Sequence, residues 1–161
     1  MDADFVHFEG LRELYMACCV GVTDAAFVHL RGLHALDSWC NQPTITDAAF
    51  AHLGGIQRLG IVSCFQDTIT DAAFQHLRGI QVLNMSFCRQ FTDAAFVHLR
   101  GIHTLTMEYC DQVTITGASF PSLKGVSMLG MFDCSGAAIA SAQSLGLPVL
   151  TEGGMLGTFT Y

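Results

Sequence analysis

Cysteine, histidine and aspartate can bind metals or perform acid–base and nucleophilic chemistry, and in this 161-residue chain they recur at fixed places. Six of the seven cysteines share one position of a repeated pattern: Cys19, Cys40, Cys64, Cys88, Cys110 and Cys134. A second shared position holds histidine: His7, His29, His52, His76 and His98. A third holds aspartate: Asp2, Asp24, Asp47, Asp71 and Asp93. These residues can act together only if the fold gathers them around one point.

The spacing of these residues reveals an internal repeat, which decides how they are arranged. The string TDAAF or a variant of it begins at Thr23, Thr46, Thr70, Thr92 and Thr116 (as TGASF), at intervals of 22 to 24 residues, and returns in decayed form as DADF from Asp2. The copies at Thr70 and Thr92 continue with x-H-L-R-G and then with L-x-M-x-x-C, and the other copies continue with related strings. Copies of this kind stack side by side, because one copy cannot bury its own apolar face. Equivalent residues then form rows with parallel side chains.

The arrangement of these residues in rows argues against a metal site and against catalysis. A metal site needs three or four convergent ligands, and a row offers at most two neighbours. Equivalent aspartates have near-identical environments, so they cannot divide the roles of acid and base, and we expect them to favour the positive N-terminus of each helix. No nucleophile, phosphate-loop or metal-protease motif occurs. We therefore predict no catalytic residue, no metal and no cofactor, and a protein that is not an enzyme.

The cysteine and histidine rows have structural interpretations. We expect the cysteines to be buried thiols that pack the turn after each strand, with weak hydrogen bonds to the loop backbone. Cys18 lies outside the row, and a reactive role for it stays open. The histidines precede an inward leucine, so they are expected on a half-exposed outer flank, where a pH-sensing or metal-binding role is the alternative.

Two periodicities alternate within each copy. After Thr70, Phe74 and Leu77 follow helical spacing, and Leu83 and Met85 then follow the two-residue spacing of a strand. Threonine is a good helix N-cap, and the Arg-Gly pair suits the helix end. Each unit is therefore predicted to be a helix, a turn and a short strand.

Stacked units of this kind predict an α/β fold. The sequence I-x-x-L-x-M-x-x-C followed by T-D-A-A-F resembles the leucine-rich repeat, and in particular the cysteine-containing subclass of F-box leucine-rich-repeat proteins. The resemblance covers residues 2 to 134. It implies a right-handed solenoid with short parallel strands on the concave side and helices on the convex side. We expect about six repeats in residues 1–134 and a degenerate C-terminal repeat or cap in residues 135–161.

Two further rows should form the core of this fold. The strands contribute Leu14, Leu36, Leu59, Leu83, Leu105 and Leu129. The helices contribute Phe5, Phe27, Phe50, Phe74, Phe96 and Phe120. The second unit reads LDSWC, one residue shorter than L-x-M-x-x-C, so a local irregularity is expected near Ser38.

Composition narrows the classes of function. Hydrophobic residues make up 51% and charged residues 13% of the chain, which excludes general disorder. A formal net charge of −7 argues against nucleic-acid binding. No apolar stretch is long enough to span a membrane, and the N-terminus lacks the pattern of a signal peptide. We expect an intracellular, cytoplasmic protein.

The positions that differ between copies on the outward face of the strands are the best candidates for function. Aromatic residues there could form a strip for protein binding, or could pack between the units as core. The candidate partner-binding residues are Tyr15, Asp37, Trp39, Asn84, Phe87, Thr106, Glu108, Tyr109 and Phe132.

We therefore predict a non-enzymatic protein–protein interaction module that binds an unknown protein partner through its concave sheet. The alternatives are a substrate-recognition part of a ubiquitin ligase, which the resemblance implies, and a structural component of a larger assembly. The first unit begins without a polar cap, so self-association through the N-terminal end is also expected.

Overall fold

The computed structural model describes residues 2–17, 19–39 and 42–152, with only the backbone of Trp39. It contains one seven-stranded sheet in which the strands are all parallel and follow each other in chain order. This confirms the predicted α/β class. The strands are β1 (Glu13–Ala17), β2 (Ala35–Trp39), β3 (Arg58–Gly60), β4 (Val82–Asn84), β5 (Thr104–Thr106), β6 (Met128–Gly130) and β7 (Val149–Leu150).

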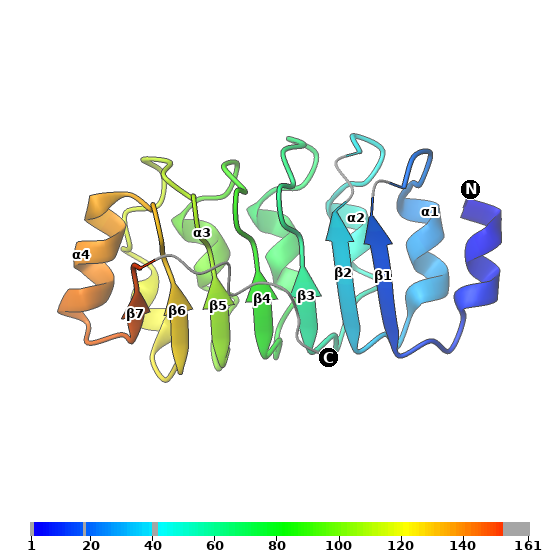
Figure 1. The fold of residues 1–161 in the computed structure, drawn as a ribbon. Coiled ribbons are helices and arrows are strands. Elements are labelled where there is room, and N and C mark those ends of the chain that lie inside the picture. Colours follow the sequence, from blue (N-terminus) through cyan, green and yellow to red (C-terminus); the bar gives the residue numbers. More distant parts are fainter. Residues whose placement is uncertain (1, 18, 40–41, 153–161) are drawn as a thin grey trace.

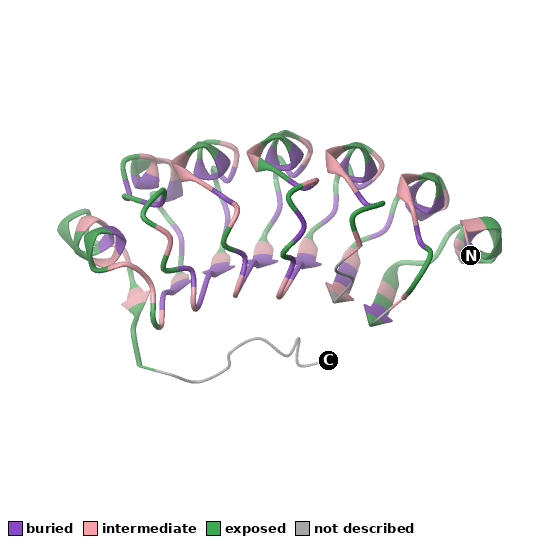
Figure 2. Cartoon of the chain, turned by 90° about the horizontal axis from the view of Figure 1, so that it is seen from above, coloured by how far each residue is buried: buried purple, intermediate pink, exposed green. Residues whose placement is uncertain are grey.

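Short helices precede and connect the strands, and they lie along one side of the sheet (Figure 1). Viewed from above, the units follow a shallow arc, with the strands on its inner side and the helices on its outer side (Figure 2). The helices are η1 (Asp2–Phe8), α1 (Asp24–Phe27), η2 (Val28–Leu30), α2 (Asp47–Phe50), η3 (Asp71–His76), α3 (Asp93–Phe96), η4 (Phe120–Leu123) and α4 (Gly136–Ser144). None of the helices in this described part is long and apolar enough to cross a bilayer.

The core lies between the helices and the sheet and consists of the two predicted rows. Strand register places the six leucines opposite one another from β1 to β6, and five of them are buried. The six phenylalanines are all buried. The rings of Phe96 and Phe120 make an edge-to-face contact, with centroids 5.1 Å apart. Such pairs add about 1 kcal/mol to the free energy of apolar burial.

Most of the helices are single turns. In unit after unit a threonine caps the first turn, as Thr46 does by accepting a hydrogen bond from the Ala48 N–H at 3.1 Å. A glycine with positive φ, such as Gly79 at 85°, then turns the chain toward the next strand. A repeat of 22 to 24 residues leaves space for only one or two turns between these two signals, which explains the short α- and 3₁₀-helices.

The irregularity expected near Ser38 is absent from β2. All five residues of β2 pair with β1, and Ser38 lies opposite the inward-facing Met16. Counted from the paired leucines, Ser38 occupies an inward position that Ile61 and Met85 fill in later units. The smaller side chain borders a cavity of about 20 Å³ between the second and third units.

The segment after Cys134 adds one more helix and strand to the fold. Ser135 caps α4 through a hydrogen bond from the Ala138 N–H, and β7 pairs with β6 through Leu129 and Val149. Strand β7 lies within the Leu145–Leu150 stretch that the sequence marks as a strand. Residues 136–150 therefore continue the helix–strand order of the preceding units.

Candidate functional site

The face of the sheet that points away from the helices, here called the open face, carries the candidate residues. Strand register divides them into two groups. Tyr15 pairs with Asp37 across β1 and β2, and Asn84 pairs with Thr106 across β4 and β5. Gly60 of β3 lies between these groups, opposite both Asp37 and Asn84. Because Gly60 has no side chain, the two groups are separated by bare backbone.

In the sequence Trp39 stands directly before Cys40, as Phe87 stands before Cys88 and Tyr109 before Cys110, which suggests an equivalent position in the repeat. The structure contradicts this equivalence, because the backbone of Trp39 ends β2 opposite Ala17, which is two residues before Cys19. The side chain of Trp39 lies outside the described part of the chain, as do Cys18 and Cys40. The structure therefore leaves the predicted contact role of Trp39 and the open question about Cys18 untouched.

Beside the second group, a continuous row of three aromatic rings follows the ends of β4, β5 and β6. We call Phe87, Tyr109 and Phe132 the aromatic row. The rings of Phe87 and Tyr109 are stacked, with centroids 4.4 Å apart and an interplanar angle of 12°. Phe132 meets Tyr109 at 80°, with centroids 5.2 Å apart. All three side chains are half-buried. The row therefore keeps apolar surface in contact with solvent and is neither core nor fully exposed.

Backbone conformation holds two of these rings in place. Phe87 and Tyr109 have φ values of 62° and 57°, in the left-handed region that favours glycine. Ser63 and Asp133 occupy the same position in their units and have the same conformation. In these four units the turn lets the chain bend inward to the next cysteine, as when the Cys88 N–H donates to the Met85 carbonyl at 3.2 Å. A left-handed residue that is not glycine costs about 1–2 kcal/mol.

Polar side chains lie beside this aromatic row and are more buried than the sequence indicates. Asn84, Thr106 and Glu108 are 3–7% exposed, whereas Tyr15 at the other end is 53% exposed. Asn84 Oδ1 accepts a hydrogen bond from the Ser86 N–H at 3.0 Å, and Ser86 Oγ accepts one from the Glu108 N–H at 3.1 Å. Asn84 and Ser86 therefore support the backbone where β4 and β5 end.

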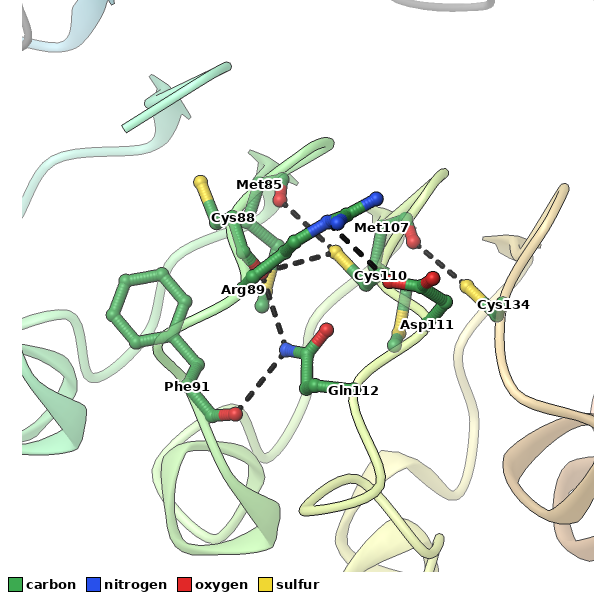
Figure 3. A network of polar contacts seen from close by, with 9 residues as sticks. All are labelled: Met85, Cys88, Arg89, Phe91, Met107, Cys110, Asp111, Gln112 and Cys134. Atoms are coloured by element: carbon green, nitrogen blue, oxygen red, sulfur yellow. Dashed lines mark hydrogen bonds and ion pairs between the residues drawn. The ribbon is translucent and has the colours of Figure 1, made fainter. Parts of the chain in front are cut away.

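Three members of the predicted cysteine row donate hydrogen bonds to backbone carbonyls of a preceding unit (Figure 3 shows those of Cys110 and Cys134). Cys88 donates to Ile61 at 3.0 Å and Cys134 to Met107 at 2.9 Å. Cys110 donates to the carbonyls of Met85 and Cys88, at 3.4 and 3.3 Å. The expected burial with weak backbone hydrogen bonds is confirmed for Cys88 and Cys110, whereas Cys19 and Cys134 are only half-buried.

The electrostatics of these thiols argue against a nucleophile. Burial raises the pKa of Cys110 to about 12 and that of Cys134 to about 11. A hydrogen bond to Cys64 and burial raise the pKa of Cys88. The partner in that pair, Cys64, has a lowered pKa because it accepts hydrogen bonds from Cys88 and Gln90, but only 5% of it is exposed. Reactive cysteines combine a low pKa with access to solvent, and none of Cys64, Cys88, Cys110 and Cys134 has both.

A glutamine row, which sequence reasoning missed, adds to these hydrogen bonds. Glutamine stands two residues after the cysteine in four units, at Gln42, Gln66, Gln90 and Gln112. Gln112 Nε2 donates to the carbonyls of Cys88 and Phe91 in the preceding unit, at 3.1 and 3.2 Å (Figure 3). The repeated C-x-Q spacing was the signal that could have revealed it.

The aspartate row has a second role besides the predicted one. Each aspartate lies in the first turn of a helix, as predicted, and its carboxylate also accepts hydrogen bonds from the threonine of the next unit. Asp47 binds the Thr70 N–H and hydroxyl, both at 2.7 Å, and Asp71 binds Thr92 in the same way. Thr23 similarly holds the pKa of Asp2 below its usual value. The row therefore joins neighbouring units in addition to its place at the helix N-termini.

The histidine row lies along the helix side of the molecule, as the sequence predicts. His7 is exposed, and the other four members of the row are half-buried. His29 contacts Glu9 at 2.7 Å, and His52 contacts Arg31 at 3.4 Å. Within residues 2–17, 19–39 and 42–152, no three histidine, cysteine or acidic side chains are grouped closely enough to hold a metal ion.

In a comparison with known proteins, the chain matches no protein-family model and no curated protein sequence. The fold alone defines the class, an α/β protein with one all-parallel sheet built from repeated helix–strand units. The site consists of the aromatic row with the buried polar side chains beside it.

Proposed function

We propose that the chain is a right-handed leucine-rich-repeat solenoid and a non-enzymatic module that binds another protein through the open face of its sheet. Residues 1–134 supply about six repeats, and residues 135–161 form a degenerate last repeat that serves as a cap. A repeat length of 22 to 24 residues and the in-register leucines of six strands support the repeat assignment.

The aromatic row of Phe87, Tyr109 and Phe132 is the observation that carries the binding proposal. Two rings stand on left-handed residues, where a glycine would avoid the conformational cost. Ser63 and Asp133 share this conformation, so it belongs to the repeat, and what distinguishes Phe87 and Tyr109 is that they place aromatic rings at it. The rings remain half-exposed, and aromatic residues dominate the binding energy of protein interfaces.

The proposal excludes nucleic acid and membrane as partners. The chain carries 7 lysine and arginine residues against 14 acidic ones, and a nucleic-acid surface needs clustered positive charge. The polar residues of the open face (Asp37, Asn84, Thr106 and Glu108) are equally unsuited to the acyl region of a bilayer. An interface with a protein tolerates both features.

Affinity capture with the immobilised chain, followed by affinity measurement on a recovered partner, tests the proposal. Replacing Trp39 and Tyr109 with alanine together should weaken binding about 30-fold or more, the effect of losing one interface hot spot. The control is Val97→Ala, because Val97 is 45% exposed at the end of α3 on the helix side of the molecule. Equal affinities for the wild type, the double variant and the control would rule out this surface.

A further inference from the structure

Glu108 is a carboxylate without a described partner on a protein-binding face. It follows β5 and is 6% exposed, and no hydrogen-bond donor or ion-pair partner among the described residues reaches its side-chain oxygens. Burial alone raises its pKa. A buried charge normally has a partner, because its separation from water costs free energy.

The glycine at position 130 leaves this carboxylate uncovered by any side chain of the strand next to it. A Cβ atom built on Gly130 would lie 3.8 Å from Glu108 Oε1 and 3.2 Å from Thr106 Cγ2, so even one added carbon would be crowded against β5. Because the residue is glycine, no side chain from position 130 stands between the carboxylate and the outside of the open face.

The surroundings favour a positive charge. Phe132 takes the position of Glu108 in the next unit, since Thr106 pairs with Gly130, and Phe132 contacts the ring of Tyr109. Aromatic faces attract cations. Two further carboxylates, Asp111 and Asp133, act together with Glu108 on the neighbouring Cys134 thiol.

Only one of these three carboxylates is neutralised. Asp111 pairs with Arg89 at 3.3 Å (Figure 3), while Glu108 and Asp133 have no ion-pair partner among the described residues. The local charge is therefore negative. A ligand for this place has to bring a positive charge with it.

We propose that Glu108 receives a basic side chain, arginine before lysine, from a peptide segment of the protein that docks on the open face. A planar guanidinium can bind both oxygens of a carboxylate and stack on neighbouring rings, which an ammonium group cannot do. This inference rests on the proposed function and adds the chemistry of the partner to it.

Two alternatives to a separate protein partner are the C-terminal residues of the same chain and a second copy of the chain. Residues 153–161, with the sequence GGMLGTFTY, contain no lysine, arginine or histidine and so offer no positive side chain to Glu108. A second copy of the chain could offer its exposed arginines. Light scattering of the wild type and of Glu108→Gln tests this, because a dimer that the substitution dissociates would overturn the assignment to a separate partner.

Peptide display against the full-length chain tests the proposal directly. A library of random decapeptides should yield binders that share an arginine or lysine next to an apolar residue. In the best binder, replacing arginine with neutral citrulline should weaken affinity at least tenfold, and replacing it with lysine should have a smaller effect. Glu108→Gln should weaken the arginine peptide at least tenfold but leave the citrulline peptide unchanged. The matched control, Glu9→Gln on the helix side, should bind all peptides as the wild type does.

Misfolding cannot imitate this result. Removing a buried, unpartnered charge should raise the melting temperature of Glu108→Gln at pH 7, so lost binding would come with a more stable fold. Binders without a basic residue, or binders whose citrulline and arginine forms respond equally to Glu108→Gln, would overturn the inference. If such binders still lose affinity in Tyr109→Gly, the proposed function stands without it. If no binder depends on Tyr109, the proposed function fails as well.

Discussion

Tyr109 offers a sharp test of how the aromatic row is held, because glycine and alanine should behave there in the reverse of their usual order. Its φ of 57° lies in the left-handed region, and its ring stacks on Phe87. Alanine at this position removes the ring and keeps the conformational cost. Glycine removes the ring and the cost together, because it has no Cβ atom.

The magnitudes follow from these two contributions. Loss of the stacked ring should cost about 1 kcal/mol beyond the apolar area it buries, in either variant. Relief of the left-handed conformation is worth about 1–2 kcal/mol, and the greater freedom of glycine in the unfolded chain takes back about 0.5–1 kcal/mol. We therefore expect Tyr109→Gly to be more stable than Tyr109→Ala by about 1 kcal/mol, or about 3 °C in melting temperature.

Urea unfolding followed by circular dichroism measures this difference. Val97 is the matched control, since it has an ordinary helical φ of −63° and is 45% exposed. There the usual order applies, and Val97→Ala should be more stable than Val97→Gly by about 1 kcal/mol. If alanine were more stable than glycine at position 109 too, the left-handed conformation would not be a real constraint, and the argument from strain would fail.

Four further predictions concern other parts of the molecule. Ser38→Val should fill the cavity behind β2 and stabilise the fold by about 1 kcal/mol, and a lower melting temperature would contradict that packing. Asp47→Ala should cost about 2 kcal/mol because it removes two charge-assisted hydrogen bonds to Thr70, whereas Asp67→Ala, at an exposed loop residue, should cost almost nothing; equal losses would refute the inter-unit role. Burial raises the pKa of Glu108 in the folded state. The gain in melting temperature from Glu108→Gln should therefore be complete above this raised pKa and should vanish as the pH falls below the pKa of an exposed glutamate. A gain that persists in acid would show that the buried charge does not cause it. Self-association through the N-terminal edge should raise the scattering mass with concentration, and a constant monomer mass would exclude it.

The sequence was sufficient for the regular parts of this fold because every unit repeats the same local signals. The Thr caps, the glycines at helix ends and the leucine and phenylalanine rows each recur at one spacing, so the register of the sheet followed from counting. The alternation of helical and two-residue spacing likewise indicated the order of elements. These features depend on residues close together in the chain.

The contacts between units were harder to predict because they join residues 20 or more positions apart. Asp47 was interpreted from its own helix, but its carboxylate turns to Thr70 of the next unit. Gln112 reaches back to Cys88 in the same way. Sequence spacing shows that a residue recurs, whereas only the three-dimensional stack shows which neighbour it contacts.

The candidate site was predicted in part. The aromatic residues before and near the cysteines were found because they vary where the rest repeats, and three of them do form one row. The left-handed backbone beneath Phe87 and Tyr109 was missed, because no glycine marks the position. The burial of Glu108 was missed as well, since strand alternation assigns it to the face opposite the core.

Chemical-shift mapping by NMR tests most directly whether the open face is the binding surface. An isotope-labelled chain would be titrated with a peptide recovered by display, and the shifts of backbone amides followed to saturation. We predict that the largest shifts fall on Phe87, Glu108, Tyr109 and Phe132, with little change along the histidine row. Shifts that concentrate on the helix side would contradict the account.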